Sequence, residues 1–164
     1  MKILSIVGAA ALVAFGFAAQ ASAETFTFSP TGTAITVSGP TTLSADGLSV
    51  SCTSTFTGST SSTGATGTIT AATFTGSNTL CAKITAKNLP WTVTPTSATT
   101  VSIAEPEVQL VDGIITVTCG PGTLTNQAFS NSVLTLSGTL NPGSCTVSGT
   151  LTASPTVTIV SSGG

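Results

Sequence analysis

The sequence predicts an all-β protein with a single antiparallel β-sandwich domain, Ig-like or similar, and two intrachain disulfides. Three observations predict this fold: apolar and hydroxyl side chains alternate along many short runs, turn residues separate the runs, and no amphipathic helix of useful length follows residue 23. Period-two alternation places each kind of side chain on one face of a strand. Many short strands with frequent turns are typical of a β-sandwich or a closed barrel, and the sandwich is the predicted form.

The first 23 residues are expected to be a cleaved signal peptide. Lys2 supplies a positive charge, residues 3–19 are uncharged and mostly apolar, and Ala21-Ser22-Ala23 has the small side chains that a signal peptidase accepts. The apolar run is slightly short for a retained transmembrane anchor, and no basic stop-transfer residues follow it. No Cys follows it for lipid attachment, and one Trp without any Tyr cannot form the aromatic girdles of a membrane barrel. We therefore expect secretion with no stable membrane insertion after cleavage.

The β-domain is expected over residues 24–160, with residues 161–164 as a flexible tail. The clearest alternation runs over residues 48–56, from Leu48 to Phe56. Thr suits such strands because its branched side chain fits a half-exposed pleated surface. The other expected strands lie at residues 26–28, 33–37, 66–70, 72–75, 99–103, 114–119, 133–136, 145–151 and 157–160.

Turn signals fall between these runs. Asp-Gly pairs suit tight hairpins because both residues tolerate positive φ. Residues 59–67 are rich in Ser, Thr and Gly and are expected to form a long hairpin loop. The turn signals are Ser29-Pro30, Gly39-Pro40, Asp46-Gly47, Asn88-Leu89-Pro90, Asp112-Gly113, Gly120-Pro121-Gly122 and Asn141-Pro142-Gly143.

Four cysteines predict two disulfides, since an even count in an exported chain is typical of a disulfide framework. Three pairings are open, and we favour Cys52–Cys81 with Cys119–Cys145 because each pair lies within one half of the chain. The chain-entropy model assigns ~3.5 kcal/mol to each such loop. A zinc site would need closely spaced Cys or His pairs, which the sequence lacks.

The charge of the chain excludes several partners. After removal of the signal peptide the basic residues are Lys83 and Lys87 alone, against five acidic residues, and there is no Arg or His. Two lysines cannot displace the counterions of a nucleic acid, so no nucleic acid partner is expected. Ser and Thr, rather than charges, are expected to hydrate the surface.

The sequence predicts no enzyme, cofactor or metal ion. Without His there is no Ser-His or Cys-His pair, and the thiols are expected to be oxidised. Glu105 and Glu107 flank Pro106, and two carboxylates at a suitable separation could hydrolyse a glycosidic bond. A secreted glycan hydrolase or glycan-binding module therefore remains an alternative, and a solvated loop is the favoured interpretation of this pair.

Trp91 is the sole Trp, and it follows Lys83 and Lys87 closely in the chain. These three residues form a candidate patch for contact with a ligand or a surface. The competing interpretation, which we favour, is that Trp91 fills the end of the core, since large aromatic side chains dominate core burial.

Six motifs, in order, resemble a known family. They are Phe28-Ser29-Pro30-Thr31-Gly32, Leu48-Ser49-Val50-Ser51-Cys52-Thr53, Phe56-Thr57-Gly58, Leu89-Pro90-Trp91-Thr92, Thr118-Cys119-Gly120-Pro121-Gly122, and the run from Cys145 to Ala153. Together with four matching cysteines they resemble the secreted bacterial proteins called protein activator of alkane oxidation (PraB-like). The resemblance covers nearly all of residues 24–160. It implies an extracellular protein of a Gram-negative bacterium, associated with growth on hydrocarbon and with surface attachment or biofilm matrix, and it implies no catalytic residues.

The leading functional hypothesis is a non-enzymatic, secreted surface or biofilm-matrix protein. It would act at interfaces through cell adhesion, hydrocarbon contact or emulsification that supports alkane use. The chain has few charges to protect its strand edges, so self-association through edge strands is also expected, with Glu24 to Phe28 as the candidate edge. The alternative is a pilin-like fibre subunit that assembles by β-strand exchange.

Overall fold

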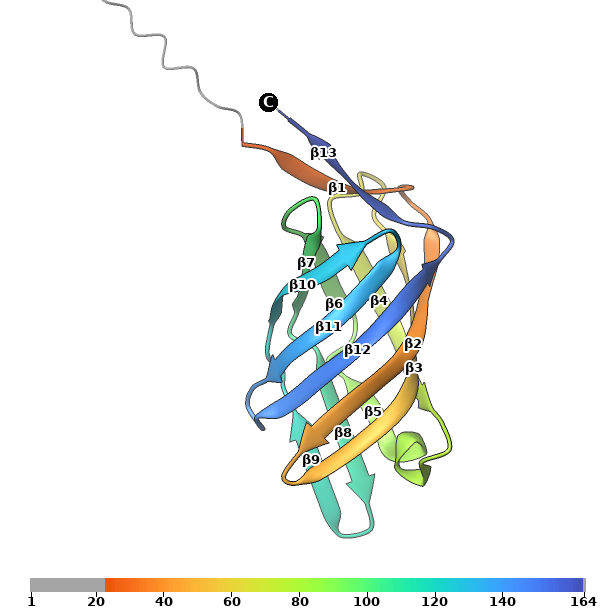
Figure 1. Cartoon of the computed structure of the whole chain (residues 1–164), viewed down its shortest axis with the longest axis vertical. Helices are drawn as coiled ribbons and strands as arrows, with labels where there is room; N and C mark the ends of the chain where they lie inside the picture. The colour runs from red at the N-terminus through yellow and green to blue at the C-terminus, as the bar shows by residue number, and fades with distance from the viewer. Residues whose placement is uncertain (1–22, 164) are drawn as a thin grey trace, which may run out of the picture.

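Eight antiparallel strands form a closed barrel (Figure 1). In the computed structural model, which describes residues 23–163, the strands neighbour one another in the order β10-β11-β12-β2-β3-β4-β6-β7, and β7 pairs with β10 to close the sheet. The predicted signal peptide lies outside the described residues except for Ala23. The barrel strands are β2 (Ala34–Ala45), β3 (Leu48–Thr60), β4 (Gly67–Thr75), β6 (Trp91–Pro95), β7 (Thr100–Ala104), β10 (Leu124–Ser130), β11 (Val133–Leu140) and β12 (Cys145–Ser154).

The predicted all-β class with two disulfides is confirmed, but the predicted β-sandwich is wrong. The main sheet has no free edge, because β12 pairs with β2 from Thr146↔Ser44 to Ser154↔Thr36 and β10 pairs with β7. A sandwich consists of two sheets packed face to face, whereas here a single sheet curls until its two edge strands pair with each other. The alternation along each strand is the same in both architectures.

Side chains alternate between the inside and the outside of the barrel. In β3 the buried positions include Val50, Cys52, Ser54 and Phe56, and the alternate residues Ser51, Thr53 and Thr55 face outward. On the outer surface, hydroxyls of β2 and β3 meet across the strands: Ser38 with Thr55 at 3.1 Å, Thr42 with Ser51 at 3.0 Å and Ser44 with Ser49 at 3.2 Å. Cross-strand pairs of this kind add a few tenths of a kcal/mol each, about 0.2–1. The barrel is therefore apolar inside and coated with hydroxyl groups outside.

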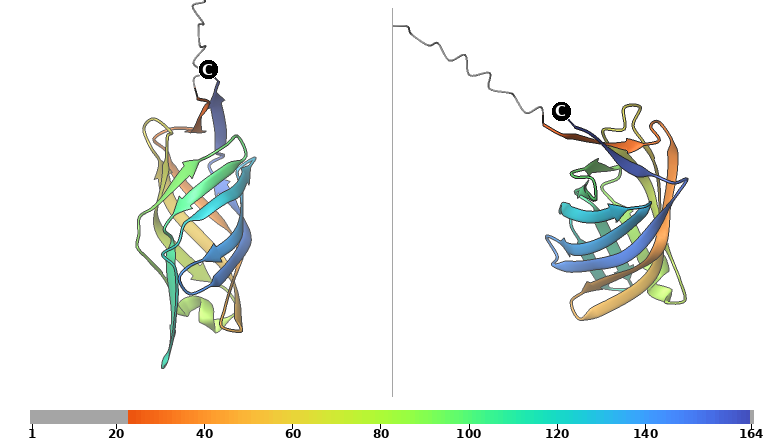
Figure 2. Two further views of the ribbon diagram at one scale, coloured as in Figure 1. Left: turned by 90° about the vertical axis from the view of Figure 1, so that its left-hand side faces the viewer. Right: turned by 45° about the horizontal axis from the view of Figure 1, so that its top comes forward.

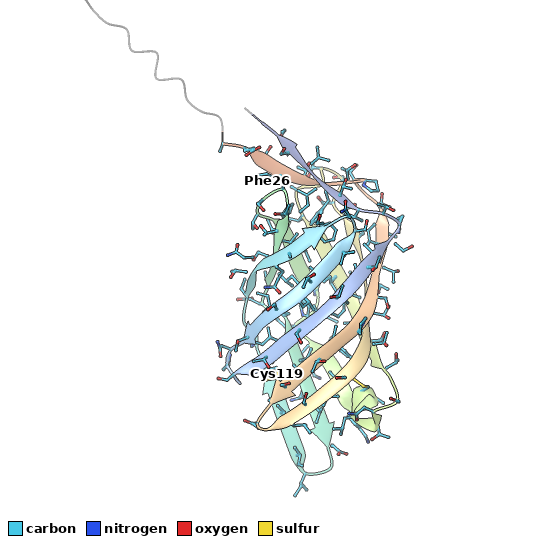
Figure 3. All side chains as sticks on the ribbon, in the orientation of Figure 1. Phe26 and Cys119 are labelled. Carbon is cyan, nitrogen blue, oxygen red and sulfur yellow. A yellow bond between two sulfur atoms is a disulfide. The ribbon has the colours of Figure 1, made fainter. Side chains whose placement is uncertain are left out.

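Two smaller sheets lie at opposite ends of the barrel (Figures 1 and 2). At one end β1 (Thr25–Ser29) pairs with β13 (Thr158–Ser162). Ser161 and Ser162 therefore belong to a strand rather than to the predicted tail, because they pair with Phe26 and Thr25. At the other end the 3₁₀ helix η1 (Thr79–Lys83) leads into a three-stranded sheet of β5 (Ile84–Lys87), β8 (Glu107–Asp112) and β9 (Ile115–Cys119). Figure 3 places Phe26 and Cys119 towards these opposite ends.

Most of the predicted turns are confirmed. Asp46 and Gly47, with φ of 51° and 78°, join β2 to β3 in a two-residue hairpin, and residues 61–66 form the loop expected between β3 and β4. The turn predicted at Gly39-Pro40 is wrong, because β2 continues through both residues. A Cβ at Gly39 would lie 2.1 Å from the carbonyl oxygen of Thr150, so glycine here permits a close approach of β12.

The disulfides pair Cys52 with Cys81 and Cys119 with Cys145, as favoured from the sequence. Cys52 lies in β3 and Cys81 in η1, whereas Cys119 ends β9 and Cys145 begins β12. Each bond therefore joins one side of the three-stranded sheet to a barrel strand. The helical structure within residues 23–163 includes nothing with the length and hydropathy of a membrane span.

Candidate functional site

The candidate patch of Trp91, Lys83 and Lys87 does not form a shared surface. The Trp91 side chain is only 3% exposed, and its ring meets the ring of Phe56 edge-on at a centroid distance of 5.9 Å. Its indole Nε1 donates a hydrogen bond to the carbonyl oxygen of Lys87 at 2.8 Å. Both lysine side chains point to solvent. Trp91 thus packs in the barrel core, in keeping with the interpretation favoured from the sequence.

Glu105 and Glu107 occupy different local environments. Glu105 is exposed in the turn before β8 with φ of 49°, and its carbonyl oxygen accepts a hydrogen bond from Asn88 Nδ2 at 3.0 Å. Glu107 begins β8 and lies opposite Lys87 in the register of β5 and β8. Within residues 23–163 no three His, Cys, Asp or Glu side chains gather as a metal ligand set would.

The hairpin of β8 and β9 projects beyond the end of the barrel (Figures 1 and 2). Its turn consists of Gly113, with φ of 63°, and Ile114, between the paired residues Asp112 and Ile115. A positive φ at the first turn residue only is the pattern of a type II′ hairpin, which glycine favours. We call residues 111–115 the hairpin tip.

The hairpin tip exposes apolar side chains. Ile114 is fully exposed, and Ile115 and Val111 are 57% and 44% exposed. Among the described residues, these three and Val160 are the exposed large hydrophobic side chains, so three of the four lie within five residues of the chain. Asp112 is the charged residue of the tip. In the register of the hairpin Ile115 pairs with Asp112 and Val111 pairs with Thr116, so Ile115 and Val111 lie on opposite faces, and Ile114 lies in the turn between the strands.

The barrel interior holds two apolar chambers. The first, which we call the upper chamber, has a volume of about 80 Å³ and lies at the β1–β13 end, where Phe28 and Val157 line it. The second, the lower chamber, has a volume of about 60 Å³ and extends towards the three-stranded sheet, where Ile84 and Val108 line it. Phe56 lines both chambers.

Buried polar groups inside the barrel are paired with one another or with backbone. The hydroxyls of Thr41 and Ser54 lie 2.5 Å apart. The Thr60 hydroxyl donates to the carbonyl oxygen of Pro30 at 2.8 Å. Among the described residues no buried side-chain nitrogen or oxygen lacks a hydrogen-bond partner. The chambers therefore present hydrocarbon surface and no unpaired polar group.

Neither the projecting hairpin tip nor the interior chambers could be recognised from the sequence. Residues 114–119 were expected to form a strand, but alternation does not reveal how far a hairpin extends beyond the core. The chambers could not be expected from the sequence, because the spaces between core side chains depend on pairings across the whole barrel.

Comparisons with known proteins place the chain in a family. Neither a curated protein nor a solved structure matches it. A family model described as "Alkane oxidation protein activator PraA/PraB-like" matches residues 1–161. The chain therefore belongs to the PraA/PraB-like family of alkane oxidation protein activators, as the resemblance of its motifs predicted.

Proposed function

We propose that this protein is a non-catalytic, secreted surface protein that supports alkane oxidation by contact with hydrocarbon surfaces. Its family name assigns a role as an activator of alkane oxidation, which describes support of a reaction rather than its catalysis. Two disulfides support an oxidising destination outside the cytoplasm. The same contact with apolar surfaces would serve adhesion or emulsification.

The observation that carries this proposal is the apolar hairpin tip. Ile114 and Ile115 extend from the end of the molecule opposite to β1 and β13, so they can enter an oil surface before the barrel reaches it. Asp112 ends β8 directly opposite Ile115, so its carboxylate, which stays in water, limits the depth of insertion to the level of Ile115. The hydroxyl-coated barrel wall remains hydrated behind the tip.

The gain from this contact follows from the exposed apolar area. Transfer of a fully exposed Ile side chain such as Ile114 from water into hydrocarbon is worth ~2 kcal/mol, and a half-exposed Ile such as Ile115 is worth ~1 kcal/mol. Together they correspond to a change of roughly 100-fold in the half-saturating protein concentration at the oil surface.

The test measures adsorption of the purified protein to n-hexadecane droplets in water. Depletion of the aqueous phase is followed by the fluorescence of Trp91, and the interfacial tension by a pendant drop. The double variant Ile114→Ser/Ile115→Ser should require roughly 100-fold more protein for half-saturation. The matched control Val160→Ser removes a side chain that is 47% exposed at the opposite end, and it should change adsorption by less than about threefold.

Equal adsorption of the wild type and the double variant would overturn the proposal. The hairpin tip could instead contact a second copy of the chain, since β9 pairs only with β8 in its sheet and carries no charged side chain on its free edge. Size-exclusion chromatography separates the two outcomes. A dimer that dissociates in the double variant, with droplet adsorption unchanged, would make the tip an interface between copies and refute the contact with hydrocarbon.

A further inference from the structure

The two-stranded sheet of β1 and β13, which we call the ribbon, has one covered edge and one open edge. On the side of β1 away from β13, the backbone N–H of Phe28 donates to the carbonyl oxygen of Gly64 at 2.7 Å. The loop between β3 and β4 therefore covers this part of β1. Within residues 23–163 β13 pairs with β1 alone, so the other edge of β13 is open.

The register of the ribbon shows which backbone groups lie on the open edge. Residues that face each other in antiparallel strands alternate between pairs that exchange hydrogen bonds and pairs that do not. Because the N–H of Phe28 points to Gly64, the pair Phe28↔Ile159 is of the second kind, and so is Phe26↔Ser161 two residues away. The N–H and C=O groups of Ile159 and Ser161 therefore point away from β1. Among residues 23–163 no backbone group pairs with them.

Nothing in the sequence of β13 protects this edge. Natural edge strands are usually blunted by charged residues, by Pro or by a bulge. Residues 158–162 include no charged residue and no Pro, and their pairing with β1 is regular. Val160, in the middle of the strand, is 47% exposed. A ribbon of two strands is marginally stable by itself, whereas a sheet of three or more strands is stable, so a further strand would stabilise the ribbon.

The open edge of β13 is its own complement. When two copies of β13 run antiparallel about a two-fold axis at Val160, Ile159 of each copy lies opposite Ser161 of the other. Each such pair can exchange the two hydrogen bonds of a closely spaced pair. Val160 then meets the same residue of the second copy in a pair without hydrogen bonds, where side chains approach most closely. The contact buries an exposed apolar side chain and brings no charges together.

We propose that two copies of the protein associate through β13, with Val160 at the two-fold axis, so that two ribbons become one four-stranded sheet. Such an isologous contact closes as a dimer and does not grow into a fibre. The site lies at the end of the molecule opposite to the hairpin tip, so it goes beyond the proposed contact with hydrocarbon (Figure 1). Two short strands bury less than the roughly 1,200 Å² of a stable complex, so the dimer is a transient one that forms where the protein is concentrated.

Cysteine cross-linking of the purified protein traps a transient dimer. The register places the two Cα atoms of residue 160 about 4.5 Å apart, which a disulfide can span. Val160→Cys should therefore form a covalent dimer under mild oxidation, visible on a non-reducing gel. The matched control Thr158→Cys lies on the same exposed face of β13, but its two copies are four residues out of register, ~13 Å apart. It should cross-link at least ~10-fold more slowly, and equal rates would overturn the proposal.

The same register makes a second pair of positions testable. It places Thr158 of one copy opposite Ser162 of the other, so a mixture of Thr158→Cys and Ser162→Cys should give the mixed dimer. A mass tag on one of the two proteins identifies that product. Mixed and self-linked dimers in equal amounts would show random collision and refute the register.

Charge variants test the dimer without an added thiol. Val160→Lys and Val160→Glu each place like charges opposite each other, so each should sediment as a monomer at high concentration. An equimolar mixture pairs opposite charges and should restore the dimer. A mixture that stays monomeric, or a single variant that still dimerises, would refute the contact at Val160.

This proposal and the contact with hydrocarbon fail separately. Addition of Ile114→Ser/Ile115→Ser to Val160→Cys should leave the rate of cross-linking unchanged, even though the tip variant adsorbs less to droplets. Loss of cross-linking in that protein would place the contact between copies at the hairpin tip and overturn the role of β13. The control Val160→Ser remains valid in the droplet assay, because the transient dimer is dissociated in dilute protein.

Discussion

Replacement of Gln127 tests the closure of the barrel. Gln127 is 3% exposed in β10, where the register with β7 shifts between Leu124 and Gln127. The regular pairing of β10 with β11 covers only residues 128–130 of β10. Next to these residues the Gln127 side chain, rather than the backbone of β10, makes the hydrogen bonds to β11. Its Oε1 accepts from Ser137 N at 2.8 Å, and its Nε2 donates to the carbonyl oxygen of Ser137 at 3.2 Å and to that of Thr125, within β10, at 2.8 Å.

The substitution Gln127→Leu keeps a similar volume and removes all three hydrogen bonds. A buried backbone N–H or C=O left without a partner costs about 1–3 kcal/mol. We expect the free energy of unfolding to fall by about 3–4 kcal/mol, measured by urea denaturation with Trp91 fluorescence. The matched control is Gln109→Leu, because Gln109 donates one long bond of 3.3 Å at the surface of β8 and should change stability by less than about 0.5 kcal/mol.

The substitution Gln127→Glu adds a dependence on pH. A carboxylate can accept from Ser137 N, but it cannot donate to the two carbonyl oxygens that Nε2 now meets. Burial and these carbonyls would raise the pKa of Glu in the folded state above its unfolded value of about 4.3. Stability should therefore be close to wild type below about pH 4 and fall as the pH rises through the folded pKa. A loss of unfolding free energy below about 1 kcal/mol for Gln127→Leu would refute this account of how β10 joins β11. A stability of Gln127→Glu that does not change with pH would refute it as well.

Two further predictions concern the covalent and steric limits of the barrel. The double variant Cys119→Ser/Cys145→Ser removes the disulfide that closes a loop with a sequence separation of 26. It should lower the free energy of unfolding in urea by about 3.5 kcal/mol and speed hydrogen exchange in β9. Unchanged exchange in β9 would argue that this disulfide does not anchor the hairpin. Gly58→Ala places a Cβ 1.8 Å from the carbonyl oxygen of Thr68, so it should lower the free energy of unfolding by more than about 3 kcal/mol in thermal denaturation. The control Gly47→Ala has free space around the new Cβ but a φ of 78°, so it should cost only about 1 kcal/mol. Similar losses in the two variants would contradict the steric argument.

Local features of the fold could be predicted from the sequence. The alternation over residues 48–56 became β3, and Asp46-Gly47 became a hairpin turn, because each signal acts between neighbours in the chain. At the second Asp-Gly pair the turn is shifted by one residue, to Gly113-Ile114, and Asp112 is paired in β8. The favoured disulfide pairing also follows from sequence proximity. The strands that were not expected include β5 and β6, which have only four and five residues.

Closure of the sheet could not be predicted. It depends on β12 meeting β2, which joins residues more than a hundred positions apart, as in Ser154↔Thr36. No local pattern records such a pairing, and an inward apolar face is common to barrels and sandwiches. Gly39-Pro40 illustrates the difficulty, because the dipeptide that marks a turn at Gly120-Pro121 lies within a continuous strand here, where β12 approaches closely.

The hairpin of β8 and β9 carries apolar residues on one face that are buried near the barrel and exposed at the tip. Leu110, Val117 and Ile115 lie on the same face of the hairpin, because 110 pairs with 117 and 112 pairs with 115. Leu110 is buried at 3% exposure and Ile115 is 57% exposed, so this face continues past the point where the core ends. Beyond the core it carries Asp112 on β8 beside Ile115 on β9, so the exposure reflects both the length of the hairpin and a change of residue type on that face.

That exposed face cannot easily collapse onto the barrel. Cys81 holds the chain just before β5, and Cys119 holds the end of β9, so both sides of the three-stranded sheet are tied to barrel strands. A flexible hairpin would fold its isoleucines against the nearest apolar surface and hide them from water. Because the disulfides hold the sheet in place, Ile114 stays exposed and available to an apolar surface outside the molecule. Reduction of the protein should therefore weaken adsorption to hexadecane even where the barrel itself stays folded.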